Sequence, residues 1–341
     1  MIGAPHTRFV LPEQLSADRP PESRGLRRDE VRLLVADDAA VWHARFRDLG
    51  RFLRAGDLVV VNTSGTLAAA VEAGTLVLHF SSRLDDDTWV VEPRRHDQTG
   101  PVRDVRAGTP MELPGGGTVT PLARLPGSDR LWRARVDVPG GVEAYLTRYG
   151  RPIAYRYLRG RFPLSAYQTV FAHDPGSAEM PSAGRPFSTE LVTELVSAGV
   201  VIAPITLHTG VSSLESGEAP QAERFHVPPH TASLVGWARR HGARVVAVGT
   251  TVARALESVA RPDGSVSAGA GWTDLVLSPD RPARVVSGLI TGLHEPEASH
   301  LLLLEAVAGP ALVQRVYDAA VDHRYLWHEF GDSCLLLPNP G

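Results

Sequence analysis

Hydrophobic positions follow two different patterns along the chain, and the change between them predicts two kinds of structure. Continuous apolar runs at residues 33–37 and 57–62 are typical of short buried strands, and residues 43–56 between them have helical character ending at Gly56. From about Leu67 to Val138, short strand-like stretches are separated by Gly, Pro and Asp turns. Closely spaced strands of this kind favour a small barrel or sandwich.

After Val138 the pattern returns to mixed α/β. A helix is predicted from about Ala232 to Gly242, followed by a buried strand at residues 244–248 and a helix that runs to about Ala260. We therefore expect an α/β fold with two domains. Residues 1–66 and 139–341 would form a mixed α/β domain built from both ends of the chain, and residues 67–138 would form an inserted all-β barrel domain.

Two loops precede helices and could bind a ligand. Residues 171–187 are rich in Gly, Pro and Ser and lead into a helix that Ser188 caps and Gly199 ends. The turn at Gly249 joins a strand to a helix and carries two threonines. Helix N–H groups at both places would suit a polar or anionic ligand. An ordinary ordered loop and simple N-capping are the alternatives, and the turn lacks the GxGxxG pattern of dinucleotide binding.

Composition narrows the possible functions. The chain has 341 residues and is 43% hydrophobic, enough for a core in each of two domains. All 35 basic residues are Arg, which excludes a Walker lysine and Schiff-base chemistry. Cys334 is the single cysteine, and no apolar run approaches the roughly 20 residues that span a bilayer. We expect a cytoplasmic protein with no metal and no membrane partner.

The net charge of −3 gives no overall basic field of the kind that many nucleic-acid-binding proteins have. Basic residues nevertheless gather in residues 148–161, interleaved with tyrosines, and Arg148, Arg156 and Arg159 are candidate phosphate contacts. The same stretch is equally compatible with a solvated surface.

Isolated polar residues offer further candidates. His208 follows a predicted strand, and Asp274 and Asp332 lie beside a strand and in a turn, respectively. Each could act as a base, although structural roles are commoner for a lone His and for an Asp in a turn. Pro296 argues against a metal site between His294 and His300.

The order of several longer motifs resembles the S-adenosylmethionine:tRNA ribosyltransferase-isomerase family of queuosine biosynthesis over essentially the whole chain. The motifs are FVLPEQL, RDEVRLLV, FRDLGRFLRAGDLVVVN, YQTVFA, GSAEMPSAGRPFSTEL, VVAVGTTVARALES, GWTDLVLSP, GLITGLHEPEASHLLLLEAVAG and FGD. The resemblance implies an α/β domain with an inserted β-barrel. It also implies transfer of the ribosyl part of S-adenosylmethionine to the aminomethyl arm of a deazaguanine in tRNA. The ribosyl group is rearranged to an epoxycyclopentanediol, and adenine and methionine are released.

The retained loop and turn lead us to expect that the chain binds S-adenosylmethionine as a co-substrate. The residues that would bind it are Ser182, Gly184, Phe187, Thr250, Thr251, Arg254, Glu257, Trp272 and His294. On a helix, Thr250, Arg254 and Glu257 are one turn apart in succession, so they could address one pocket.

The chain departs from the family pattern at four places. Thr63-Ser64-Gly65 and Ala68-Ala69-Ala70 stand where the family usually has Asp-Thr-Arg and Pro-Ala-Arg. Arg185-Pro186 replaces a Leu-His pair, and residues 218–226 keep Glu223 but lack the family's run of histidines. Three interpretations therefore stay open: a divergent tRNA-modifying enzyme, a relative that uses S-adenosylmethionine on a small molecule, and a non-catalytic binder.

Overall fold

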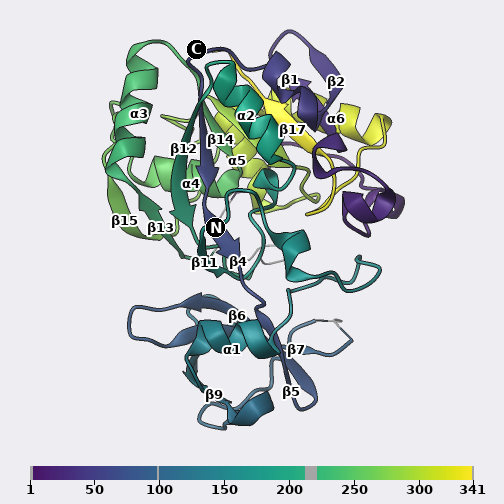
Figure 1. Ribbon diagram of the computed structural model, residues 1–341, viewed down its shortest axis with the longest axis vertical. Helices are drawn as coiled ribbons and strands as arrows, with labels where there is room; N and C mark the ends of the chain where they lie inside the picture. The colour runs from purple at the N-terminus through teal and green to yellow at the C-terminus, as the bar shows by residue number, and fades with distance from the viewer. Residues whose placement is uncertain (1–2, 98–99, 212–220, 340–341) are drawn as a thin grey trace.

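A nine-stranded mixed sheet forms the larger lobe of this computed structural model, which describes residues 3–97, 100–211 and 221–339 (Figure 1). Its strands follow the order β15 (Gly269–Thr273), β13 (Glu223–Val227), β12 (Val201–Leu207), β3 (Leu58–Asn62), β14 (Val245–Val248), β16 (Gly288–Gly292), β17 (Ser333–Leu336), β1 (Arg32–Ala36) and β2 (Val41–Arg45). Strands β12, β3, β14 and β16 are parallel, so their carboxyl ends share one edge of the sheet.

The smaller lobe is a six-stranded antiparallel sheet that curls into a nearly closed barrel (Figure 1). Its strands follow the order β5 (Ala70–Ala73), β6 (Leu76–Arg83), β7 (Trp89–Arg95), β10 (Trp132–Asp137), β9 (Thr118–Arg124) and β8 (Met111–Glu112). Helix α1 (Val142–Tyr149) packs on it, because Tyr145 and Leu146 are buried in the core of this lobe. A two-stranded ladder of β4 (Ser64–Thr66) and β11 (Asp174–Ser177) lies between the lobes (Figure 1).

Helices cover both faces of the large sheet, because alternate residues of each strand point to opposite sides. The other α-helices of the described chain are α2 (Thr189–Ser197), α3 (Pro229–Arg240), α4 (Thr250–Ser258), α5 (Ser299–Ala308) and α6 (Pro310–Asp322). Val60 and Ala247 face α3 to α6, whereas Val59 and Val246 face α2. Cys334 of β17 is fully buried, and this burial raises the pKa of its thiol to about 12.

Short 3₁₀ helices complete the described secondary structure. They are Glu13–Leu15, Pro21–Arg24, Arg28–Glu30, Phe46–Arg51, Pro114–Gly116, Leu164–Tyr167 and Ser182–Gly184. No helix of the described residues is long and apolar enough to cross a membrane.

The predicted helix at residues 43–56 is wrong. Residues up to Arg45 belong to β2, whose ladder with β1 pairs Trp42 with Val35. The chain then forms the 3₁₀ helix Phe46–Arg51. Phe46 and Leu49 are both fully buried, and a spacing of three residues matches the 3₁₀ repeat. Pairing with β1 and burial of these two side chains therefore outweigh the helical character of the stretch.

The other predicted elements are confirmed within one to three residues at their ends, and so is the α/β fold with a barrel-like sheet. Ser188 caps α2 as expected, since its hydroxyl accepts a hydrogen bond from the Leu191 N–H at 3.2 Å. The domain limits at residues 66 and 139 stay a prediction.

The carboxylate of Asp57 joins the amino ends of β3 and β14. Asp57 is 3% exposed and accepts hydrogen bonds from Arg54 N at 2.8 Å and from Arg244 Nε at 3.0 Å. The Arg244 guanidinium also donates to the carbonyl of Phe52 at 2.9 Å. This ion pair therefore fixes the edge of the sheet opposite the carboxyl ends of the parallel strands.

We predict that Asp57→Asn lowers the free energy of unfolding by about 2–3 kcal/mol, because it leaves the half-buried Arg244 guanidinium without its counter-charge. Chemical denaturation of the variant measures the loss. The exposed Asp280→Asn is the matched control and should change stability by less than about 0.5 kcal/mol. Equal stability of the two variants would contradict the assignment.

Candidate functional site

The carboxyl ends of β12, β3, β14 and β16 form the edge of the large sheet that continues into the β4–β11 ladder (Figure 1). In open α/β sheets, ligands bind at the carboxyl ends of the strands. The residues that leave this edge are polar: Ser64 after β3, His208 after β12, Thr250 after β14 and His294 after β16.

Three side chains from separate segments meet there in one hydrogen-bonded chain. Ser64 Oγ lies 2.6 Å from Ser177 Oγ and 2.7 Å from His208 Nδ1. Both serines are buried, and burial lowers the pKa of His208, so its imidazole is neutral at pH 7. A Cβ on Gly176 would lie 2.4 Å from His208 Nδ1, so only glycine admits the ring at this distance. The arrangement offers a proton acceptor beside two hydroxyls.

Asn62 positions this chain of polar groups. Its Oδ1 accepts hydrogen bonds from the N–H groups of Ser64 and Leu207, both at 3.0 Å. Its Nδ2 donates to the carbonyl of Leu207 at 2.8 Å and to Thr251 Oγ1 at 3.4 Å. One amide therefore connects the ends of β3 and β12 with the first turn of α4.

Thr250 and Thr251 begin α4 at this edge, after Gly249, whose φ of +94° favours glycine. Arg254, one turn later, is 9% exposed and pairs with Glu223. Glu223 also accepts a hydrogen bond from Gly210 N at 3.1 Å, and burial raises the pKa of its carboxyl against the opposing effect of Arg254. Arg254 therefore fixes the chain beside His208.

The side chain of Glu257 does not point toward the same partners as Arg254. Its carboxylate accepts backbone hydrogen bonds from Arg284, Val285 and Val286 at 2.8–3.0 Å. The structure therefore does not bring Arg254 and Glu257 together, and Glu257 holds the segment that leads into β16. Helical spacing alone could not show this, because the side chains turn to different partners.

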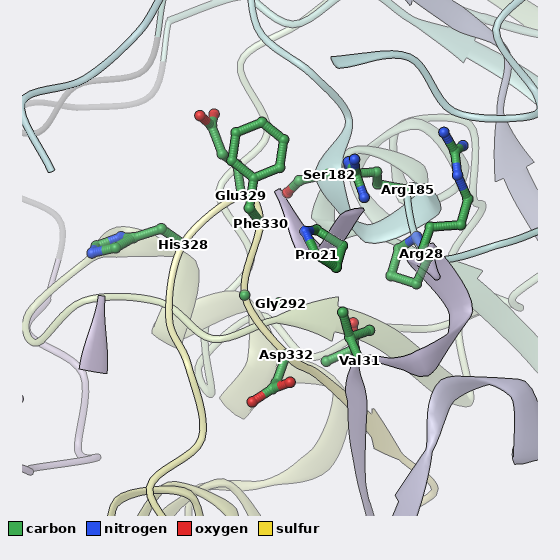
Figure 2. A pocket seen from close by; sticks show the side chains of 13 residues that line it. Pro21, Arg28, Val31, Ser182, Arg185, Gly292, His328, Glu329, Phe330 and Asp332 are labelled. Atoms are coloured by element: carbon green, nitrogen blue, oxygen red, sulfur yellow. The ribbon is translucent and has the colours of Figure 1, made fainter. Parts of the chain in front are cut away.

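The Ser182 loop lines a small crevice at the same edge, beside Gly292, His328 and Glu329 (Figure 2). Arg185, from the same loop, is 3% exposed and donates to Glu22 Oε2 at 2.7 Å and to the carbonyl of Ala166 at 2.8 Å. Its guanidinium lies over the ring of Phe330, 5.1 Å from the ring centre. Ser182 and Arg185 thus both line the crevice, and the guanidinium of Arg185 is held there by contacts within the protein.

Glu329 stands out among the crevice residues. Burial and the nearby negative charge of Glu179 raise the pKa of its carboxyl to about 8. Its Oε1 is buried and has no hydrogen-bond partner among the residues that the structure describes. Beside it, burial lowers the pKa of His328 to about 4, and this ring stacks on Tyr157 at 4.1 Å between ring centres. The crevice thus holds a neutral carboxyl group and a neutral imidazole at pH 7.

His294 lies near this edge with its ring stacked on His300, 4.6 Å between centres. Its Nε2 is 3.0 Å from Thr291 Oγ1, and burial lowers its pKa well below the usual value. Within the described part of the chain, no three His, Cys, Asp or Glu side chains are grouped so as to hold a metal ion.

Several predicted residues lie elsewhere or are held by structural contacts. Phe187 is fully buried against Phe46 and Phe171, and Gly184 is buried in the same loop beside Thr169. Asp332 is 4% exposed and accepts hydrogen bonds from Arg32 N and Leu326 N, both at 2.8 Å.

The remaining predicted residues are at the surface. Trp272 donates its indole N–H to Asp85 of the small lobe at 2.9 Å, and Asp274 is exposed after β15. Arg148, Arg156 and Arg159 are all exposed; Arg148 lies over the ring of Tyr149, and Arg159 pairs with Asp18 at 3.2 Å.

Asn62, Ser64, His328 and Glu329 were not predicted as site residues, and Ser177 was predicted only as part of the ligand-binding loop at residues 171–187. Asn62 ends a predicted strand and Ser64 follows it, and polar residues at such a position are a usable signal. Nothing in the local pattern around Ser177 or Glu329 indicates the partners that they meet in the fold.

We predict that Glu329→Gln removes a pH dependence of stability. The raised pKa means that the folded protein keeps this proton when the unfolded chain loses it, near pH 4.5, so stability falls as pH rises toward 8. Glu329→Gln should therefore melt at a higher temperature than the wild type at pH 9 and at a similar temperature at pH 5.

The exposed Glu194→Gln on α2 is the control and should follow the wild type at both pH values. Identical melting curves for Glu329→Gln and the wild type at pH 9 would show that the carboxyl ionises freely. Differential scanning calorimetry measures all three proteins.

Known proteins match this chain over nearly its full length. The family model described as queuosine biosynthesis protein matches residues 5–336. An S-adenosylmethionine:tRNA ribosyltransferase-isomerase from Symbiobacterium thermophilum is 34% identical, covering 96% of this chain and 98% of the relative. The enzyme of the same name from Gloeobacter violaceus is 35% identical, covering 98% and 95%.

A solved structure supports the same relationship. The S-adenosylmethionine tRNA ribosyltransferase from Thermotoga maritima superposes with a TM-score of 0.55 and 27% identity, covering 96% of this chain and 99% of the other. The family model and both relatives span the two lobes and the edge between them. This chain therefore belongs to the queuosine biosynthesis protein family.

Proposed function

We propose that this protein transfers the ribosyl part of S-adenosylmethionine to the aminomethyl deazaguanine of tRNA and isomerises it to the epoxycyclopentanediol, with release of adenine and methionine. The observation that carries the proposal is the full-length match to relatives named for this reaction, which cover 96% and 98% of the chain. The proposal makes S-adenosylmethionine the co-substrate and tRNA the partner, and it places the protein in the cytoplasm, where a tRNA-modifying enzyme meets its substrate.

The polar edge of the large sheet can supply the acid and base groups that this reaction needs. The amine of the acceptor loses a proton when it bonds to the ribosyl carbon and the carbon–sulfur bond to methionine breaks, and adenine gains a proton when its bond to the ribosyl group breaks. His208 is neutral at pH 7 and is oriented by Ser64, so we assign it the role of proton acceptor. Glu329 keeps its proton up to about pH 8, so we assign it the role of proton donor.

The two loops are assigned to binding S-adenosylmethionine. Thr250 and Thr251 present hydroxyls and N–H groups at the start of α4, and Ser182 faces the crevice from the other loop. We assign a supporting role, without contact to the ligand, to four further residues: Gly184, Phe187, Arg254 and Glu257. Their buried contacts hold the loop and the helix in place, so their replacement should alter binding through position.

The reaction itself is the first test. Incubated with S-adenosylmethionine and tRNA bearing the aminomethyl deazaguanine, the protein should release adenine and methionine, measured by liquid chromatography. The control is the same tRNA without that base, which should give no release. Release that is independent of tRNA would assign a small-molecule acceptor instead. Absence of S-adenosylmethionine binding in titration calorimetry would contradict the proposal altogether.

His208→Gln tests the proton acceptor. We predict a fall in kcat of about 10²–10⁴-fold with little change in melting temperature, because glutamine fills similar space but cannot accept the proton. In the wild type, kcat should fall on the acid side only below pH 6.5, since burial lowers the pKa of His208 from that value. It should fall again above about pH 8, where Glu329 loses its proton. The exposed His241→Gln, at the far end of α3, is the control. Unchanged kcat in His208→Gln would remove His208 from the mechanism.

A further inference from the structure

A second crevice lies on the small lobe, between strands β5 to β7 and the chain that follows α1. Its wall carries three arginines, Arg94, Arg95 and Arg151, together with His79, and none of its lining residues is a carboxylate. The remaining walls are small or apolar, from Ala70, Val77, Pro152 and Ala154. The crevice is therefore lined by one sign of charge.

The inner wall is a buried ionic cluster centred on Glu92. Glu92 is fully buried and accepts hydrogen bonds from Arg130 at 2.6 Å and from Arg94 at 3.1 Å. The adjacent His79 ring and these two cations hold the pKa of its carboxyl at about 2 against the effect of burial. The negative charge of Glu92 is thus balanced by two arginines.

His79 lies beside this cluster and is 6% exposed. Its Nδ1 is 3.5 Å from Glu92 Oε2 and has no hydrogen-bond partner within the described residues. A buried ring nitrogen without a hydrogen bond is costly, so a ligand that supplies one is favoured there.

The outer wall carries guanidinium groups that reach solvent. Arg151 pairs through Nη1 with Glu72, whose side chain is 37% exposed, and Arg95 is exposed at the end of β7. Arginine has five N–H donors, so bonds through Nη1 leave further donors in Arg94 and Arg151. Such forks match the oxygens of a phosphate.

We propose that this crevice binds a backbone phosphate of tRNA. The space is small: only about 10 Å³ is open to the centre of a water-sized sphere, so one phosphate oxygen fits but a base does not. Ala70 N donates to the carbonyl of Arg151 at 2.9 Å, which fixes the crevice to the start of β5.

The position suits a substrate whose reacting base lies at the edge of the large sheet. Ser64 and Ala70 are six residues apart in the chain, which spans at most about 20 Å when extended. The bound phosphate would therefore lie within a few nucleotides of the reacting base. This inference rests on the proposed function, since it takes tRNA as the partner.

The test is charge reversal with a matched control. Arg95→Glu places a carboxylate on the crevice, whereas Arg135→Glu makes the same change in net charge at an exposed position of β10 outside it. Binding of fluorescently labelled tRNA is measured by anisotropy between 50 and 200 mM salt. The slope of log Kd against log salt should fall by about one in Arg95→Glu and stay near the wild-type value in Arg135→Glu.

Arg95→Lys should keep most of the wild-type affinity for tRNA, because lysine keeps the positive charge that Arg95→Glu reverses. Both glutamate variants replace exposed side chains, and unchanged melting temperatures will show that they fold. Equal slopes and affinities for Arg95→Glu and Arg135→Glu would contradict phosphate binding by the crevice. The absence of tRNA binding by the wild type would contradict it as well.

Adenine release is measured on the same samples, which separates the two proposals. If the wild type releases adenine with tRNA and Arg95→Glu binds tRNA normally, the proposed function stands and phosphate binding by the crevice is contradicted. If the wild type binds tRNA through Arg95 but releases no adenine, the proposed reaction is contradicted and phosphate binding by the crevice stands.

Discussion

The side-chain amide of Asn62 is the contact on which the polar edge of the large sheet depends. A buried amide is costly unless both its oxygen and its nitrogen form hydrogen bonds. Asn62 meets this requirement only when the carboxyl ends of β3 and β12 and the first turn of α4 lie side by side. Its bond to Ser64 N also sets the direction in which the chain leaves β3 toward the small lobe. The hydroxyl that orients His208 is therefore placed by a residue that need not touch a substrate.

The sequence pattern was informative where structure is local. Turn residues separate the barrel strands clearly. Ser188 marks the start of α2 because its hydroxyl bonds to a residue only three positions later in the sequence. The edge strand β2 was missed because its ladder partner, not its own pattern, makes it a strand. The meeting of Ser64 with Ser177 and His208, 113 and 144 residues away, depends on which parallel strands are neighbours. No local pattern contains that information.

The departures from the family pattern fall at structurally related places. Ser64 lies in the first altered stretch and belongs to the polar edge, whereas Ala70, the last residue of the second, lines the crevice of the small lobe. Arg185 lies in the third and is tied to Glu22 beside the Ser182 loop. Residues 218–220 of the stretch before Glu223 lie outside the described residues. The departures thus fall at the polar edge, at the crevice of the small lobe and beside the Ser182 loop, while the two sheets keep the family architecture.

The burial of Cys334 has a practical consequence. The single thiol of the protein is fully enclosed in β17, and a pKa of about 12 leaves almost no thiolate at neutral pH. Maleimide and iodoacetamide reagents need the thiolate, so they should leave the native protein unmodified. A cysteine introduced at any exposed position would then be the sole reactive group. A dye pair, one on each lobe, can therefore be attached without first removing a native residue, and it would report lobe separation by energy transfer.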